Sequence, residues 1–185
     1  MKKILLILLL SFVAACASNI SSMKELRFNQ KDPYNLNVGT IEIVDDNNEP
    51  DKISIDLPIY PDSSLKIWAN DRIKSVSENK SKFKVSINKA FITETTIHAK
   101  RKLEEDQKLY KISLDVKFEL YDNDPIFPSA EMMINVSRSK SIDDNKSLNE
   151  KRSLCYGLIT DALGDLDSKF TENFPSYFNN IKVID

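Results

Sequence analysis

The residues that could carry out chemistry are few in this chain of 185 residues. It contains one histidine, His98, two cysteines, Cys16 and Cys155, and only three glycines. A single histidine excludes any zinc site that needs two or more imidazoles, and a Ser/His/Asp triad would have to use it. Three dispersed glycines cannot form a phosphate-binding loop, which needs clustered glycines so that the backbone can approach the phosphate closely. We therefore expect no cofactor and no metal.

Acidic residues could act as general acids or bases in catalysis or as calcium ligands, but their positions argue against catalysis and against calcium binding. The run Asp45-Asp46-Asn47-Asn48-Glu49-Pro50 places proline at the sixth position, where a calcium-binding loop needs glycine, so we interpret it as a solvated turn. Most other carboxylates fall on the polar sides of alternating segments, away from any pocket that would shift their pKa values. The chain is predicted not to be an enzyme; the best remaining catalytic case pairs His98 with a nearby serine or threonine.

The first sixteen residues predict the cellular compartment. A short basic start, Met1-Lys2-Lys3, precedes an apolar run from Ile4 to Phe12, which is too short to span a bilayer because spanning needs about 20 residues. Residues 1–15 therefore read as a signal peptide. The segment Val13-Ala14-Ala15-Cys16 resembles the bacterial lipobox. This resemblance implies that Cys16 is acylated, with palmitate or a similar chain, and anchors the mature protein in a membrane.

The start of the chain leaves one alternative open and bears on membrane sorting, net charge and cysteine pairing. The alternative to a lipobox is an ordinary secretory peptide cleaved near Ala15. By the enterobacterial sorting rule, Ala17 in place of aspartate implies the outer membrane, with the protein facing the periplasm.

Processing removes Lys2 and Lys3 and leaves 24 basic residues against 28 acidic ones, a net charge of −4, which argues against nucleic-acid binding. Cys155 is then unpaired, and we interpret it as a buried apolar residue rather than a reactive nucleophile.

The mature chain is expected to contain a tether, residues 16–37, and one α+β domain, residues 38–185. Residues 38–44 and 52–57 alternate and predict a hairpin or two edge strands. Asp62 and Ser63 could cap a helix, and Arg72 could lie over the ring of Trp68. The apolar face of this helix would consist of Leu65, Trp68, Ala69, Ile73 and Val76.

Three long strands are the clearest pattern in the chain, because each alternates between apolar and polar residues. We expect an antiparallel sheet with one buried and one solvated face. The buried faces would carry Phe83, Val85, Ile87, Phe91 and Ile97 in the first strand, Tyr110, Ile112, Leu114, Val116, Phe118 and Leu120 in the second, and Ala130, Met132, Ile134 and Val136 in the third.

A final helix should begin at Ser147-Leu148-Asn149-Glu150, which matches a capping box. Its apolar stripe would contain Cys155, Leu158, Ile159, Ala162, Leu166 and Phe170, followed by an aromatic tail, Phe174, Tyr177, Phe178 and Ile181, that folds back on the domain. Gly157 and Gly164 lie on the opposite side and either reflect composition or form a groove for a partner's backbone. The predicted fold is α+β, a mostly antiparallel sheet of about four to five strands with two helices on one face, in the order β-α-β-β-β-α.

This organisation resembles the lipopolysaccharide-assembly lipoproteins of the LptE type. The residues that carry the resemblance are Val116–Asp122, a strand running into a turn, Val136–Ser139, which ends the last strand, and the polar link to Asn149-Glu150-Lys151; the likeness covers residues 39–170. It implies two helices on a four-stranded sheet and a partner that is an outer-membrane β-barrel. The auxiliary lipoproteins of ABC-type lipid transport systems are similar, and an uncharacterised lipoprotein that shares the fold is a third reading.

The LptE-like reading also implies a surface for an anionic glycolipid. Lys100, Arg101 and Lys102 form the densest basic cluster, at a hairpin tip beside His98, and suit a lipid phosphate. Residues 104–106 are all acidic, so a plain solvated hairpin is the alternative. Arg138 and Lys140, at the end of the third long strand, are the second candidate contact.

Overall fold

The computed structural model of the chain describes residues 26–101, 105–122, 124 and 126–182. The predicted signal peptide, Cys16 and Lys102 lie outside the described residues. The elements are β1 (Tyr34–Leu36), β2 (Thr40–Asp45), α2 (Pro61–Arg72), β3 (Ile73–Ser75), β4 (Lys82–Ile97), β5 (Gln107–Tyr121), β6 (Ala130–Asp143), α3 (Leu148–Phe178) and the short 3-10 helix η2 (Asn179–Ile181).

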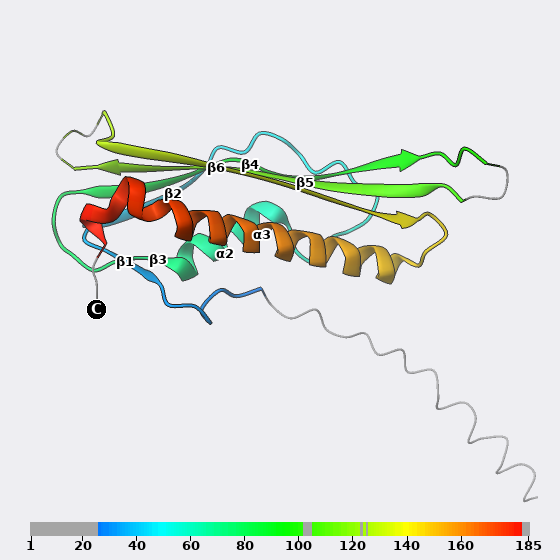
Figure 1. Cartoon of the computed structure of the whole chain (residues 1–185), viewed down its shortest axis with the longest axis horizontal. Coiled ribbons are helices and arrows are strands. Elements are labelled where there is room, and N and C mark those ends of the chain that lie inside the picture. Colours follow the sequence, from blue (N-terminus) through cyan, green and yellow to red (C-terminus); the bar gives the residue numbers. More distant parts are fainter. Residues whose placement is uncertain (1–25, 102–104, 123, 125, 183–185) are drawn as a thin grey trace, which may run out of the picture.

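A long four-stranded sheet with two helices on one face forms the body of the protein (Figure 1). The strand order is β2-β4-β5-β6; β4, β5 and β6 are antiparallel neighbours, whereas β2 runs parallel to β4. A second, two-stranded parallel sheet pairs β1 with β3. The predicted α+β class, with its mostly antiparallel sheet and two helices on one face, is confirmed. We call the sheet face toward the helices the inner face and the opposite one the outer face.

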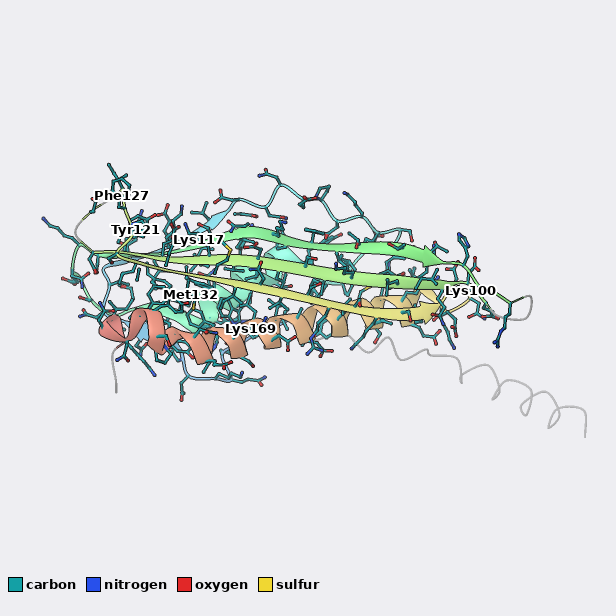
Figure 2. All side chains as sticks on the ribbon, turned by 45° about the horizontal axis from the view of Figure 1, so that its top comes forward. Lys100, Lys117, Tyr121, Phe127, Met132 and Lys169 are labelled. Carbon is teal, nitrogen blue, oxygen red and sulfur yellow. The ribbon has the colours of Figure 1, made fainter. Side chains whose placement is uncertain are left out.

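Strand β5 confirms the period-two pattern over its whole predicted length. Its six predicted inner residues, from Tyr110 to Leu120, are at most 2% exposed. Met132, Ile134 and Val136 of β6 are buried likewise, and Figure 2 shows Met132 on the inner face and Lys117 on the outer one. Alternation works here because successive side chains in a strand point to opposite faces.

Strand β4 departs from the predicted alternation at a β-bulge. The pairing with β5 shifts between Ile87 and Lys89, so that Asn88 is the extra residue. Beyond the bulge Ala90 and Ile92 are buried on the inner face, whereas Ile97 is 43% exposed. The prediction that Phe91 and Ile97 continue the buried face was therefore wrong, because one inserted residue reverses the facing of every residue after it.

The predicted hairpin between residues 38–44 and 52–57 does not form. Strand β2 pairs in parallel with β4, and the segment after it runs without regular structure along the remaining edge of β4. There Asn47 and Asp51 side chains accept hydrogen bonds from the backbone of Ala90 and Ile92, and Lys52 makes an isolated bridge to Thr93. These contacts satisfy backbone groups that the edge of β4 would otherwise leave unpaired.

Helix α2 is shorter than predicted and is not capped by Asp62 or Ser63. Tyr60 occupies the N-cap position without a side-chain hydrogen bond, and Pro61 follows as the first helical residue, where its fixed φ suits a helix start. The helix ends at Arg72 because Ile73 is extended and pairs with Tyr34 of β1. Val76, predicted on the apolar helical face, lies beyond the helix and is 51% exposed.

Helix α3 confirms the capping box and the apolar stripe. Ser147 Oγ accepts from the Glu150 amide, while the Glu150 carboxylate accepts from the Ser147 amide. All six residues of the predicted stripe are fully buried. The prediction of an aromatic tail separate from the helix was wrong, because α3 continues through Pro175 and places Phe174 and Phe178 on the same stripe. These two rings pack on each other, and they also contact Phe170 and Phe83. Tyr177 faces solvent.

The predicted tether ends earlier than residue 37. Leu26, Tyr34 and Leu36 belong to the core, and β1 lies in the small sheet with β3. Tyr34 packs edge-on against Phe170, with ring centroids 5.0 Å apart. The segment is polar in sequence, but these three apolar residues are buried. In the part of the chain that the structure describes, no helix is both long and apolar enough to cross a membrane.

Candidate functional site

A buried carboxylate joins the N-terminal segment to both helices. Asp167 of α3 is 1% exposed and accepts hydrogen bonds from Trp68 Nε1 at 3.0 Å, Arg72 Nε at 2.7 Å and Lys31 Nζ at 2.6 Å. Burial alone would raise the pKa of Asp167, but the bonds from Lys31, Arg72 and Trp68 outweigh it and lower the pKa. We call these four residues the Asp167 network.

The guanidinium of Arg72 lies over Tyr34, 5.1 Å from the ring centroid, and not over Trp68 as predicted. It also donates to the carbonyl of Asp32. A second clamp lies at Asp71, whose carboxylate accepts two bonds from Arg27 and one from the amide of Phe28. Residues 26–36 are thus held on α2 and α3 by charged contacts and by apolar burial.

The predicted hairpin tip lies at the end of the sheet far from the β5–β6 loop, as Lys100 and Phe127 mark in Figure 2. Lys100 and Arg101 are exposed there, and Lys102 is outside the described residues. His98 Nδ1 lies 2.9 Å from Asp106 Oδ2, while Asp106 Oδ1 accepts from the amide of Ala99. These bonds join the two strand ends of the hairpin, residues 98 and 99 on one side and Asp106 on the other.

Arg138 and Lys140, the second predicted anionic-lipid contact, are paired with helix α3. Arg138 donates to both oxygens of Asp165, with Nη2 2.8 Å from Oδ1, and Lys140 Nζ lies 2.8 Å from Asp161 Oδ2. The pairing raises the pKa of Arg138 further and lowers that of Asp165. A bound anion would have to compete with these two carboxylates.

Gly157 and Gly164 lie on the side of α3 that faces away from the sheet. A Cβ atom built on either would meet no heavy atom within 4 Å. Nothing in the described part of the chain therefore requires glycine at these positions. Gly39 differs, because a Cβ there would lie 1.8 Å from the carbonyl oxygen of Asn79.

The two side chains considered for nucleophilic chemistry lie in different environments. Cys155 lies on the apolar stripe of α3 and is fully buried. Burial raises the pKa of its thiol to about 12, so the thiol is not present as a thiolate at neutral pH. The interpretation of Cys155 as a buried apolar residue is confirmed. His98 is exposed at the hairpin tip and bonded to Asp106.

Sequence reasoning missed an exposed apolar tip. Ile126 and Phe127, in the loop between β5 and β6, are 72% and 71% exposed. The Asp124 carboxylate accepts from both of their amides, and Ser129 Oγ bonds to Asp122 and to the carbonyl of Leu120. Two adjacent apolar residues inside the predicted turn were the signal that could have identified it. We call Ile126 and Phe127 the apolar tip; Phe127 is labelled in Figure 2.

No family model matches the chain, and no curated protein matches it. Among solved structures, the minor lipoprotein from Acinetobacter baumannii is similar, with a TM-score of 0.41 and 12% identity over 81% of this chain and 99% of that one. A putative neuraminyllactose-binding hemagglutinin homolog from Helicobacter pylori gives a TM-score of 0.38 and 10% identity over 83% of this chain and 99% of that one. At TM-scores below 0.5 this likeness transfers no function.

Proposed function

We propose that the protein is a lipid-anchored, non-enzymatic envelope protein that faces the periplasm and binds a membrane protein, in an LptE-like role in lipopolysaccharide and outer-membrane assembly. The observation that carries the proposal is the apolar tip. Ile126 and Phe127 are exposed, adjacent and held by hydrogen bonds at the end of a long sheet. Large apolar side chains presented in this way are typical of protein-contact anchors.

The docked N-terminal segment supports a position close to the membrane. If Cys16 carries the lipid, only nine residues lie between it and Leu26, which is already part of the core. The ten residue-to-residue steps from Cys16 to Leu26 reach at most about 35 Å when fully extended. The predicted tether to residue 37 would have reached about twice as far. A short reach favours a partner embedded in the same membrane.

The membrane anchor and the partner contact are tested separately. Incorporation of labelled palmitate into the wild-type chain, and its loss in a Cys16→Ser chain, tests the anchor. The partner is tested by affinity purification of the lipidated protein from mildly solubilised envelopes, with mass spectrometry of the copurifying proteins. Equal recovery of a large outer-membrane β-barrel is the expected result. Recovery of an inner-membrane permease would instead favour an auxiliary subunit of an ABC-type lipid transporter.

The same purification tests the role of the apolar tip. We expect the double variant Ile126→Ser/Phe127→Ser to lose the partner, because its anchoring area is removed without any change in the core. The matched control is Val76→Ser/Leu148→Ser, since Val76 and Leu148 are also exposed apolar residues but lie elsewhere. Retention of the partner by the tip variant would contradict the proposal, as would its loss in the control.

A further inference from the structure

The outer face of the sheet contains a hollow that no prediction from the sequence identified. It has a volume of about 350 Å³, at the lower end of the range of about 300–1,000 Å³ typical of ligand pockets. It forms where β4, β5 and β6 each place a small or polar side chain outward. We call this hollow the outer trough and define it by Lys89, Phe91, Lys111, Ser113, Asp115 and Ser137.

The register of the strands builds the outer trough. Phe91 pairs with Ser113, and Ser113 pairs with Ser137, so one row across the sheet has an aromatic ring at one end and two small residues beside it. The neighbouring row contains Lys89 and Asp115, and Lys111 precedes Ser113 along β5. The two serines leave the space, and the larger side chains surround it. The bulge at Asn88 is what turns Lys89 and Phe91 toward this face.

Charge distinguishes the outer trough from the rest of the outer face. Farther along the sheet Lys117 Nζ lies 2.8 Å from Glu119 and 3.2 Å from Glu131, so its charge is already balanced. Within the part of the chain that the structure describes, Lys89 and Lys111 are exposed and have no ion pair or side-chain hydrogen bond. Asp115 is the one acidic residue of the outer trough and accepts a bond from Asn88 at 3.1 Å. The outer trough therefore carries one excess positive charge.

These residue types select one ligand chemistry. Two unpaired ammonium groups suit a carboxylate or phosphate, since binding displaces no existing partner. The hydroxyls of Ser113 and Ser137 and the carboxylate of Asp115 suit a ligand rich in hydroxyl groups. The partly exposed ring of Phe91 offers an apolar surface to the C–H face of a sugar ring. Phe91, Leu114 and Val136 also give the outer trough some apolar lining. The two ammonium groups and the hydroxyls, not a lack of apolar surface, therefore favour a sugar over an acyl chain.

We propose that the outer trough is a binding site for an acidic saccharide, a sugar unit that carries carboxylate groups and is free of lipid. Lys89 and Lys111 bind the anionic groups, Asp115 and the serines bind hydroxyls, and Phe91 packs against the sugar ring. This inference does not depend on the proposed function, because it involves neither the lipid anchor nor the apolar tip.

Calorimetric titration of the purified full-length protein in mild detergent tests the site, with trigalacturonate as the acidic ligand and maltotriose as the neutral one. We expect trigalacturonate to bind at least tenfold more tightly than maltotriose. The double variant Lys89→Gln/Lys111→Gln should weaken trigalacturonate binding at least tenfold. Ser137→Phe, which fills the hollow and leaves the charge unchanged, should weaken it to a similar extent. Thermal unfolding confirms that each variant is folded.

The matched control is Lys74→Gln/Lys80→Gln, which removes the same charge at exposed positions outside the outer trough and should leave binding unchanged. An equal loss in this control, or no loss in the trough variants, would overturn the proposal. Inorganic phosphate binding as tightly as trigalacturonate would show a simple anion site instead. Phosphatidylglycerol vesicles retained through Lys89 and Lys111, with no binding of trigalacturonate, would show a lipid headgroup site and would equally overturn it.

Discussion

At the scale of single residues, Asp167 is the buried carboxylate that joins the N-terminal segment to both helices. Replacing it by asparagine leaves Arg72, 4% exposed, without its charged partner. Loss of one partner of a buried pair costs about 3–5 kcal/mol, so we expect Asp167→Asn to lower the free energy of unfolding by about that amount, as measured in urea. Asp165→Asn, on an exposed pair of the same helix, should change it far less. Equal effects of the two variants would contradict the role of burial.

The same residue predicts a pH dependence. Despite burial, which acts in the opposite direction, the hydrogen bonds of the Asp167 network lower the pKa of Asp167 below its ordinary value of 3.8. A lowered pKa in the folded state stabilises the protein above pH 3.8, and this stabilisation is lost as the pH falls below that value. The difference in unfolding free energy between the wild type and Asp167→Asn should therefore shrink between pH 5 and pH 2. A difference that stays constant with pH would show that the carboxylate charge is not responsible.

Cys155 gives a prediction about reactivity. Because burial raises its thiol pKa to about 12, a Cys16→Ser chain should react with a thiol reagent at pH 8 only when denaturant unfolds it. The rate of labelling measured by mass spectrometry checks this. Fast labelling of the folded chain would mean that α3 opens readily over the sheet.

At the scale of elements, helix α3 carries two glycines that its own packing does not require. Alanine is favoured over glycine in a helix by about 1 kcal/mol, and a Cβ at Gly157 or Gly164 meets open space. We expect Gly157→Ala/Gly164→Ala to raise the unfolding free energy by about 1–2 kcal/mol. If a partner's backbone packs on this side, the same variant should also reduce copurification of that partner. Gly39→Ala, which would place a Cβ against Asn79, should destabilise the protein.

At the scale of the whole molecule, the segment 26–36 is a part of the domain. A chain that begins at residue 26 should fold, whereas one that begins at residue 38 loses the burial of Leu26, Tyr34 and Leu36. Each buried side chain of this size contributes about 1.5–3 kcal/mol, so the shorter chain should be less stable by about 5 kcal/mol or more. Thermal unfolding of the two chains compares them. Equal melting temperatures would restore the predicted domain boundary at residue 38.

The sequence by itself determined the features that depend on neighbouring residues. Alternation in β5 and β6, the capping box at Ser147 and the apolar stripe of α3 are local patterns, because the period of a strand or helix fixes which side chains share a face. The buried state of Cys155 followed from the same stripe. These patterns were enough to predict the α+β class and the placement of two helices on one face of the sheet.

Only the tertiary structure decided the features that join distant segments. The parallel pairing of β2 with β4, the bulge at Asn88 and the docking of residues 26–36 depend on contacts between residues tens of positions apart. The same holds for the candidate sites: Arg138 is neutralised by Asp165, whereas Phe91, Ser113 and Ser137 meet in one row. Local periodicity carries no information about strand register or about which charges will be paired, because the partners are brought together only when the chain folds.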